Sequence, residues 1–432
     1  METRFSPDQL ADPKMAEAEQ ILRKCVHCGF CTATCPTYVT LGNELDSPRG
    51  RIYLIKDMLE NGRAADKQVV THIDRCLSCL ACTTTCPSGV DYMHLIDHAR
   101  AHVEKTWKRP LAERFTRNLL AFVMPSPSRF RMALKLANLG RPFGGLMKRI
   151  AILRPFGAML DLAPRSVPPH SPSATPGTFP PANARRGRVI LQSGCVQPVL
   201  KPGINEAAIE LLGNLGVEVV VAAGERCCGS LVHHMGREEQ GLEAARVNID
   251  AWLDEIDARG ADALIITASG CGNTIKDYAY MLRHDPAYAQ KAARISALTR
   301  DITEYLSGLD LEERPRRVER VTYHAACSLQ HGQKVTVQPK ALLQRAGFQV
   351  REPAESHLCC GSAGTYNILQ PEISGQLKAR KVRNLQATGP DIIATGNIGC
   401  ITQIASGMNV PVIHIVELLN WAWGGRKPDG IA

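Results

Sequence analysis

Two stretches in the second half of the chain alternate short apolar runs with longer amphipathic segments. The first stretch has apolar runs at 189–191, 217–222 and 264–266 and helical patterns at 205–215 and 238–256. Short runs rich in Val and Ile predict strands, and their alternation with helices is typical of a parallel α/β sheet. Because the pattern recurs, the sequence predicts one α/β domain over 189–310 and a second over 318–424.

A different pattern, basic and amphipathic, occupies 101–160. Apolar residues recur there at helical spacing with Arg and Lys between them: Leu111, Phe115, Leu119, Phe122 and Val123, then Phe130, Leu134 and Leu136. The formal charge of the chain is +9, but Arg100 to Arg154 alone holds thirteen basic residues against two acids, or +11, which leaves −2 elsewhere. Such helices can rest on anionic lipid headgroups, dock an acidic partner subunit, or pack their apolar face on the preceding domain. The segment has no nucleic-acid-binding motif, so we expect no nucleic acid partner.

Residues 161–188 are rich in Pro, Ser, Ala and Gly and show no sustained periodicity. This composition is typical of a linker, either free or lying along a neighbouring domain.

The N-terminal 100 residues contain the C-x2-C-x2-C-x3-C-P motif twice. The two strings are Cys25, Cys28, Cys31 and Cys35, and Cys76, Cys79, Cys82 and Cys86, each followed by proline and related by a constant offset of 51 residues. In this motif three cysteines hold one [4Fe-4S] cluster and the fourth completes the cluster of the other string. The sequence therefore predicts one cluster on Cys25, Cys28, Cys31 and Cys86, and a second on Cys76, Cys79, Cys82 and Cys35.

Zinc and disulfides fit this spacing less well. Zinc sites usually take their ligands as two separated pairs, and disulfide networks belong to small secreted chains. A helix is expected between the strings, because Ser47-Pro48 can start it and Asn61-Gly62 can end it. This spacer indicates an α-helical ferredoxin domain over 1–100. His27, His72 and Arg75 lie beside the ligands and are either solvated neighbours or groups that tune the cluster potentials.

The other eight cysteines form a second repeat. They are Cys195, Cys227, Cys228 and Cys271 in one half, and Cys327, Cys359, Cys360 and Cys400 in the other. Each set follows predicted strands, so the thiols are expected at the carboxyl ends of the strands, where open α/β sheets place their sites. These cysteines are candidate metal or thiol sites, with unligated buried thiols as the alternative. The histidines nearby, at 233, 234, 324, 331 and 357, are assigned no role.

The chain of 432 residues has room for two or three domains, and no apolar run approaches the length of a membrane span. Met1 to Glu19 lacks an apolar signal core, and metal-type cysteine spacing without a signal indicates a reducing cytoplasm. No dinucleotide-binding or P-loop motif is found, and Gly361 to Gly364 is too short to bind a flavin pyrophosphate. We therefore expect no flavin, substrate or catalytic residue in this chain.

Residues 20–100 resemble the two-cluster ferredoxin module, and residues 189–420 resemble the paired cysteine-rich CCG domains of heterodisulfide reductase subunits. The whole chain resembles the iron-sulfur subunits of bacterial glycolate oxidase, which are similar to those of anaerobic glycerol-3-phosphate dehydrogenase. The motifs that carry this resemblance are Cys25 to Pro36, Ser47-Pro48-Arg49-Gly50-Arg51 and Cys76 to Pro87. One departure is that Ala268 and Asn397 stand where the reductases have the first cysteine of a C-x2-C pair, so the clusters of those relatives are not expected unchanged here.

The resemblance implies an electron-transfer subunit of a 2-hydroxy acid oxidoreductase complex. An FAD-containing partner would oxidise glycolate to glyoxylate, and this chain would pass the electrons through two [4Fe-4S] clusters to the quinone of the membrane respiratory chain. The implied location is the cytoplasm or the cytoplasmic face of the inner membrane. Three alternatives remain open: a glycerol-3-phosphate or D-lactate system with a similar subunit, a thiol-disulfide reductase acting at the CCG cysteines, and a scaffold whose clusters only hold the fold.

Overall fold

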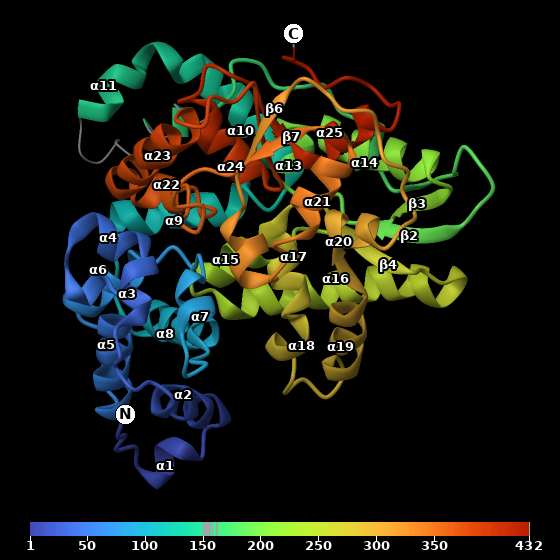
Figure 1. Cartoon of the computed structure of the whole chain (residues 1–432). Coiled ribbons are helices and arrows are strands. Elements are labelled where there is room, and N and C mark those ends of the chain that lie inside the picture. The colour runs from blue at the N-terminus through green and yellow to red at the C-terminus, as the bar shows by residue number, and fades with distance from the viewer. Residues whose placement is uncertain (150–156, 158, 161–162, 432) are drawn as a thin grey trace.

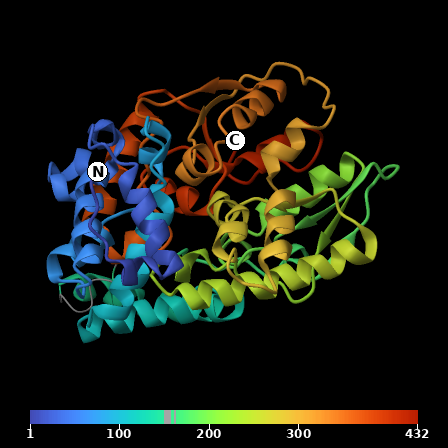
Figure 2. The same ribbon diagram turned by 90° about the horizontal axis from the view of Figure 1, so that it is seen from below.

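The computed structural model describes residues 1–149, 157, 159–160 and 163–431. A helical N-terminal module lies beside two α/β domains, and a group of helices runs from the module along the α/β domains (Figure 1). Figure 2 shows the module at one side of the molecule and the two α/β domains next to each other.

The N-terminal module is built only of helices in the described structure. They are α1 (Pro7–Leu10), α2 (Pro13–Arg23), α3 (Phe30–Thr34), α4 (Pro36–Leu41), the 3-10 turn η1 (Glu44–Asp46), α5 (Pro48–Glu60), α6 (Lys67–Asp74), α7 (Ala81–Thr85) and α8 (Tyr92–Thr106). Buried apolar side chains of α2, α5, α6 and α8 form one core that also includes Cys25, Cys76 and Cys82. The helices therefore pack directly against the predicted ligands.

Helix α5 confirms the helix expected between the two cysteine strings. The Ser47 hydroxyl accepts a hydrogen bond from the amide of Gly50 at 3.0 Å, and Pro48 occupies the first turn, where its missing N–H costs nothing. The helix ends at Glu60, directly before Asn61.

In the described residues up to 149, the module is followed by α9 (Leu111–Val123), α10 (Pro127–Gly140) and α11 (Gly144–Arg149). The buried residues of α9 are Thr116, Arg117 and Leu120, and α10 buries only Leu134. Leu111 and Leu139 are each 75% exposed, and Phe115, Phe122, Met132 and Leu136 are also exposed. The option that these helices turn their apolar stripe inward is therefore wrong for half of the stripe: Leu111, Phe115, Phe122 and Leu136 are exposed, whereas Leu134 is buried and Leu119, Val123 and Phe130 are partly buried. The physical reason is that the buried face of α9 presents Arg117 to Asp74, which Arg109 also contacts.

The segment expected as a linker contributes a strand to the first sheet. Within 161–188, the turn η4 (Pro172–Ala174) precedes β1 (Gly177–Phe179), which pairs antiparallel with β3. The first sheet thus begins about ten residues before the expected domain boundary at 189, and this part of the segment lies along a neighbouring domain.

The first α/β domain has strand order β1-β3-β2-β4-β5, parallel except for β1. Its strands are β2 (Gly187–Leu191), β3 (Val217–Val221), β4 (Ala263–Ile266) and β5 (Thr299–Asp301). Its helices are α13 (Gln197–Leu200), α14 (Gly203–Asn214), α15 (Ser230–His234), α16 (Glu238–Arg259), α17 (Ser269–Lys276), α18 (Tyr278–Met281), α19 (Ala289–Leu298) and α20 (Ile302–Ser307).

The second α/β domain repeats this topology with the order β7-β6-β8-β9, all parallel. Its strands are β6 (Arg320–Tyr323), β7 (Gln349–Arg351), β8 (Ile392–Thr395) and β9 (Val412–His414). Its helical elements are the π-helical turn η5 (Ser328–Gly332), α21 (Gln338–Arg345), α22 (Tyr366–Leu369), α23 (Pro371–Gln386), α24 (Ile398–Ala405) and α25 (Ile415–Ala422). The predicted fold class, a helical ferredoxin-type domain followed by two repeated parallel α/β domains, is confirmed.

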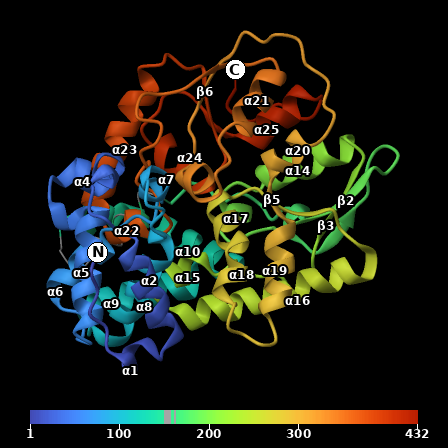
Figure 3. The ribbon, with the colours of Figure 1, turned by 60° about the horizontal axis from the view of Figure 1, so that its bottom comes forward.

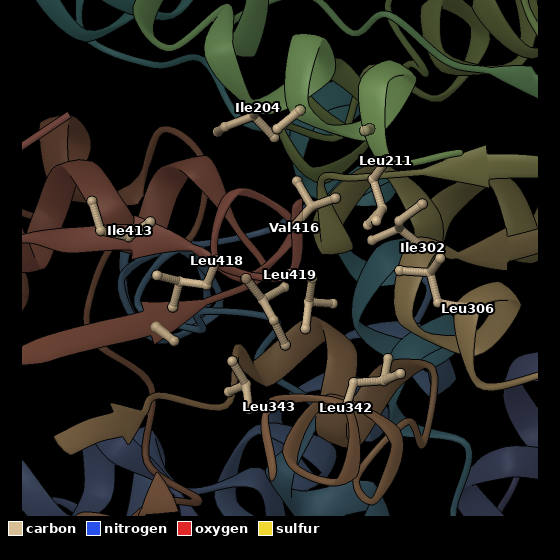
Figure 4. Packing of buried hydrophobic residues seen from close by; sticks show 14 of the residues in the cluster. Ile204, Leu211, Ile302, Leu306, Leu342, Leu343, Ile413, Val416, Leu418 and Leu419 are labelled. Atoms are coloured by element: carbon tan, nitrogen blue, oxygen red, sulfur yellow. The ribbon is translucent and has the colours of Figure 1, made fainter. Parts of the chain in front are cut away.

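The two α/β domains share a continuous apolar core. Ile204 and Leu211 of α14 lie opposite Val416 and Leu419 of α25, and all four are buried (Figure 4). Polar contacts cross the same boundary, because the ring of His414 lies 2.8 Å from the carbonyl oxygen of Thr267. The two halves are therefore packed against each other through a common core.

The N-terminal module contacts both α/β domains (Figure 3). Helix α4 packs on α23, α7 packs on η5, and α8 packs on α15. This arrangement brings one of the two cysteine strings close to the second α/β domain.

Candidate metal centres

Two neighbouring cavities open among the cysteines of the N-terminal module. The first, of about 440 Å³ including space open to solvent, is lined by Cys25, Cys28, Cys31 and Cys86, together with Cys82. The second, of about 310 Å³ measured in the same way, is lined by Cys76, Cys79, Cys82 and Cys35. The structure thus groups the fourth cysteine of each string with the first three of the other string.

The backbone of the two strings repeats as closely as the sequence does. His27 and Ser78, 51 residues apart, both have positive φ, and so do Gly29 and Leu80 directly before α3 and α7. Such left-handed residues are uncommon outside glycine. They bend each loop so that its thiols line a cavity, which is the arrangement that thiolate ligation of an iron-sulfur cluster requires.

The cysteines of the two cavities differ in exposure. Cys35, Cys76, Cys79 and Cys82, which line the second cavity, are all buried, whereas Cys28 in the first is exposed. Burial raises the pKa of the Cys79 and Cys82 thiols well above the ordinary value, and raises that of Cys31 to about 11. The first cavity is therefore the one with access to solvent or to a partner.

The run Ser47 to Arg51 places one arginine beside each cavity. Arg49 lines the first cavity and donates to the carbonyl oxygen of His27 at 3.3 Å. Arg51 lines the second, is 1% exposed, and lies 3.9 Å from the sulfur of Cys35 through its Nη1 atom. Gly50 between them is required, because a Cβ atom there would lie 2.1 Å from the carbonyl oxygen of Glu44.

Asp46 is buried and holds a charged network beneath the second cavity. Its carboxylate lies 2.7 Å from Nδ1 of His72, 3.0 Å from Nη1 of Arg75 and 3.7 Å from Nη2 of Arg51. Arg51 also donates to the carbonyl oxygen of His72 at 2.6 Å. His72 is thus a buried member of this network and not a solvated neighbour of the ligands.

The thiols of the second α/β domain converge as expected. The sulfurs of Cys327 and Cys359 are 3.7 Å apart, and those of Cys360 and Cys400 are 3.5 Å apart. Cys327 follows β6, Cys359 and Cys360 follow β7, and Cys400 lies in α24 after β8. In the first α/β domain Cys195 contacts Cys227, and Cys228 contacts Cys227 and Cys271.

Sequence reasoning gave no role to His324, which the structure places in this second group. One ring nitrogen of His324 and the sulfurs of Cys360 and Cys400 all lie within 4.8 Å of one another. Burial lowers the pKa of His324 well below its ordinary value, so the ring is neutral. The available signal was its position directly after a strand, three residues before Cys327.

Three of the other nearby histidines contact the N-terminal module. His233 and His234 lie 3.5 and 3.3 Å from the carboxylate of Asp97 in α8. Nδ1 of His331 lies 2.8 Å from the hydroxyl of Thr84 in α7. These side chains join the domains together.

The thiols of the second domain adjoin the second cavity. Cys79 of that cavity and Cys359 belong to one buried cluster with Leu77, Tyr366 and Leu377, and Cys327 packs against it. The hydroxyl of Tyr366 donates to the carbonyl oxygen of Arg75 at 3.1 Å.

The residues at the two departures from the reductase pattern start helices. Asn397 caps α24, where its side chain accepts from the amides of Gly399 and Cys400. Ala268 is the residue before α17. Neither position supplies a thiol, so each half brings four thiols together.

Comparison with known proteins follows the same division of the chain. Residues 21–90 match the family described as 4Fe-4S dicluster domain, and residues 189–276 and 321–405 each match the family described as cysteine-rich domain. A crystal structure of a hypothetical protein from Helicobacter pylori shares the fold, with a TM-score of 0.55 and 11% identity over 97% of this chain and 74% of that one. The molecule is thus an iron-sulfur protein with paired CCG domains.

Two curated relatives are similar to this chain over nearly its whole length, and a third is similar over about half of it. The glycolate oxidase iron-sulfur subunit of Escherichia coli (strain K12) is 43% identical over 98% of this chain and 99% of its own. The probable glycolate oxidase iron-sulfur subunit of Bacillus subtilis (strain 168) is 33% identical over 96% of each chain. The lactate utilization protein A of Bacillus licheniformis is 28% identical over 54% of this chain.

The chain belongs to the family of glycolate oxidase iron-sulfur subunits, which confirms the resemblance seen in its motifs. Its role is that of an electron-transfer subunit of an oxidoreductase. The described residues contain no helix both long and apolar enough to span a bilayer.

Proposed function

We propose that this chain carries electrons from an FAD-containing subunit that oxidises glycolate to glyoxylate, and delivers them to the quinone pool. The observation that supports this most directly is the pair of adjacent cavities, which share Cys82, Pro48 and Tyr92 as lining residues. Bound there, [4Fe-4S] clusters would supply one-electron steps, whereas a 2-hydroxy acid gives up two electrons at once. A flavin can accept two electrons together and release them one at a time, and we assign this flavin to the partner subunit.

The cavity linings support the proposed ligands. Cys25, Cys28, Cys31 and Cys86 are assigned to one [4Fe-4S] cluster, and Cys76, Cys79, Cys82 and Cys35 to the other. Thiolates are the donors that such clusters take, and both sets come from the repeated loops. Arg51 and Tyr92 stay close to the second set, where Tyr92 donates to the sulfur of Cys76 at 3.7 Å.

The flavoprotein is proposed to dock at the first cavity. Cys28 is exposed there, and Val26, Phe30 and Tyr53 around it are exposed apolar or aromatic side chains. Aromatic side chains are enriched in protein interfaces. Docking at this surface would cover them and bring the flavin near the first set of ligands.

The exposed surface of α9 and α10 is proposed to hold the complex on anionic lipid of the membrane. The Leu111 and Leu139 side chains are exposed on these helices, and so are the basic side chains of Arg114, Arg129 and Lys135. Apolar side chains among basic ones are typical of helices that lie in the lipid interface. This would place the chain on the cytoplasmic face, close to quinone.

Anaerobic purification with its partners tests the proposal. We expect about eight irons and eight sulfides in the ferredoxin module, a co-purifying FAD protein, and reduction of the clusters by glycolate. Glycerol 3-phosphate and D-lactate are tested side by side with glycolate. If only glycerol 3-phosphate or only D-lactate reduced the clusters, that compound and not glycolate would be the substrate. If no flavoprotein reduced the clusters, the electron-transfer role would be refuted.

A further inference from the structure

Arg100 of α8 is a buried cation held against the loop that begins the second cysteine string. Its side chain is 9% exposed, Nη2 donates to the carbonyl oxygen of Cys76 at 2.7 Å, and Nη1 donates to the hydroxyl of Ser78 at 2.5 Å. The guanidinium therefore joins the first cysteine of the string to the residue directly before the second, Cys79. The cavity linings of the described structure include Ser78 but not Arg100, so the arginine lies behind the loop and not in the cavity.

The loop has a backbone conformation that needs such support. Ser78 and Leu80, which flank Cys79, have φ of +49° and +61°. Residues other than glycine are strained in this region and stay there only when the surrounding structure holds them. A guanidinium presents its N–H groups in a rigid fork and can hold two acceptors at once, which fixes the loop on both sides of Leu77.

The first cysteine string is held in the same way. Arg49 and Arg100 are 51 residues apart, which is the offset that also relates the two strings. Arg49 donates to the carbonyl oxygen of His27 at 3.3 Å, and His27 lies between the first two cysteines of its string, as Ser78 does. Arg49 belongs to the first turn of α5, whereas Arg100 lies in the middle of α8. Since the two helical positions differ, what the two arginines share is the contact with the loop.

Only the arginine of the second string is tied to another domain. The side chain of Asp97 is 10% exposed, and its Oδ1 atom lies 3.5 Å from Nη1 of Arg100 and 3.3 Å from Nδ1 of His234. Its Oδ2 atom lies 3.5 Å from Nε2 of His233. Both histidines belong to α15 of the first α/β domain. Arg49, by contrast, is 34% exposed, and its carboxylate partner belongs to its own module.

The approach of α15 to α8 is also fixed by the backbone. Gly236, shortly after α15, has φ of +84°, and a Cβ atom there would clash with the carbonyl oxygen of Arg100. The next residue, Arg237, lies 3.8 Å from the carboxylate of Glu104 in α8. The first α/β domain therefore contacts α8 at the turn that carries Arg100 and holds Asp97 from the other side.

We propose that Arg100 is a positioning residue for the [4Fe-4S] cluster assigned to the second cavity, and that Asp97, held by α15, fixes its orientation. The first α/β domain thereby takes part in setting the reduction potential of that cluster. Hydrogen bonds and net charge around a cluster set its potential, and a nearby cation stabilises the extra negative charge of the reduced form. This inference rests on the proposed cluster ligands and deepens the electron-transfer role.

Redox titration followed by EPR tests the role of Arg100 in the full-length protein, purified anaerobically with its partner. The signal of the second-cavity cluster is the one that Cys35→Ser removes or alters. Arg100→Met should lower the potential of this cluster, so that its reduced-to-oxidised ratio at a fixed potential falls about tenfold, or about 59 mV for a one-electron couple. The potential of the other cluster should not change.

Arg188→Met is the matched control for a buried arginine. Arg188 is 2% exposed and pairs with Glu218 and Glu255, but it lies in β2, outside both cavity linings. Its replacement should destabilise the protein and leave both potentials unchanged. An unchanged potential in Arg100→Met, or an equal shift of both clusters, would overturn the role of Arg100.

Arg100→Lys separates position from charge. Lysine keeps the positive charge but cannot bridge the two acceptors in the same way, so the potential should shift less than in Arg100→Met while the EPR line shape of the second-cavity cluster changes. A line shape identical to that of the unaltered protein would overturn the positioning role. This variant also decides the matter if Arg100→Met does not retain its cluster.

A double-mutant cycle tests the link to the first α/β domain. If Asp97 acts through Arg100, Asp97→Asn should shift the potential in the unaltered protein but not in Arg100→Met. Equal shifts in both backgrounds, or no shift in either, would overturn the link. Absence of the clusters from the unaltered protein would refute the proposed ligands, whereas intact clusters with unchanged potentials in the variants would refute only the present inference.

Discussion

His94 of α8 and Asp277 of the first α/β domain share a hydrogen bond across the domain boundary, with Nε2 and Oδ1 2.9 Å apart. The other ring nitrogen of His94 lies 2.6 Å from Asp91, and the ring stacks on Tyr280 with centroids 3.4 Å apart. A single imidazole thus joins the N-terminal module to its neighbour.

This contact should make stability depend on pH. Burial alone would lower the pKa of His94, but Asp277 and Asp91 outweigh it and raise the pKa to about 9 from the ordinary 6.5. Because the folded pKa is the higher one, the stabilisation is complete below about pH 6.5 and is lost as pH rises through about 9. Thermal unfolding of the protein and of His94→Gln should therefore show a Tm difference that shrinks between pH 6 and pH 9.5.

The exposed His284, which lies 3.3 Å from Glu17, offers a control. His284→Gln should change the Tm little at any pH, because exposed pairs contribute little. If the Tm difference between the unaltered protein and His94→Gln stayed constant with pH, the proton linkage would be contradicted.

Cys35 and Cys86 should each serve the cluster of the other string. Cys86→Ser is expected to damage the cluster at the exposed cavity, and Cys35→Ser the one at the buried cavity, since each residue lines that cavity. Loss of one cluster would lower the iron content of the module from about eight to about four. EPR spectra of the reduced variants should retain different signals, and Cys271→Ser should retain both. Identical spectra for the two ferredoxin variants would refute the crossed assignment.

Arg51→Met should destabilise the protein and shift one cluster potential. Removal of the Arg51 guanidinium takes away one of the positive charges that balance the buried Asp46 carboxylate. Removing one partner of a buried ion pair typically costs about 3–5 kcal/mol of stability. Loss of a positive charge near Cys35 should also lower the reduction potential of the buried cluster. Denaturant unfolding and redox titration measure the two effects.

Arg49→Met is the matched control for that variant. The Arg49 side chain is 34% exposed and pairs with Glu44 near the surface, so its loss should cost less stability and affect the other cluster. Equal stability losses for the two variants would count against the role of burial.

Gly361→Ala should destabilise the second α/β domain more than Gly364→Ala. Both glycines have positive φ, but a Cβ atom on Gly361 would lie 2.7 Å from the carbonyl oxygen of Ser374, whereas one on Gly364 meets nothing within 4 Å. The strained backbone costs about 1 kcal/mol or more in both variants, and the clash adds to it only in the first. The free energies of unfolding of the two variants check this prediction. Equal losses of stability would show that the backbone around Gly361 shifts enough to relieve the clash.

The surface of α9 and α10 should bind anionic vesicles. Replacing both Leu111 and Leu139 by Gln is expected to weaken sedimentation with vesicles that contain phosphatidylglycerol, and added salt should weaken it further. Val318→Gln removes an apolar side chain that is at least as exposed but lies elsewhere, and should have no effect. Undiminished binding of the double variant would place the membrane contact on another surface.

The sequence predicted those features that depend on local pattern. Helix α5 follows from its cap and its proline, and β2, β3 and β4 follow from the short apolar runs at 189–191, 217–222 and 264–266. Strand β1 was missed because its three residues form a strand only by pairing with β3. His324 was missed because its closeness to Cys360 and Cys400 depends on the packing of three strands, which no local spacing reveals. Whether the apolar residues of α9 face inward or outward stayed open for a similar reason, since it is the contact of Arg117 with Asp74 that turns Arg117 to the inner face.

The unequal covering of the two cavities bears on how the protein behaves in air. Dioxygen can reach Cys28 directly, whereas Cys35, Cys76, Cys79 and Cys82 are all enclosed by protein. Oxidative damage should therefore bleach the two centres in sequence, the outer one within the first phase and the inner one later. A bound partner that covers Cys28 would then act as a shield as well as an electron donor, so the isolated subunit should lose colour faster than the assembled complex.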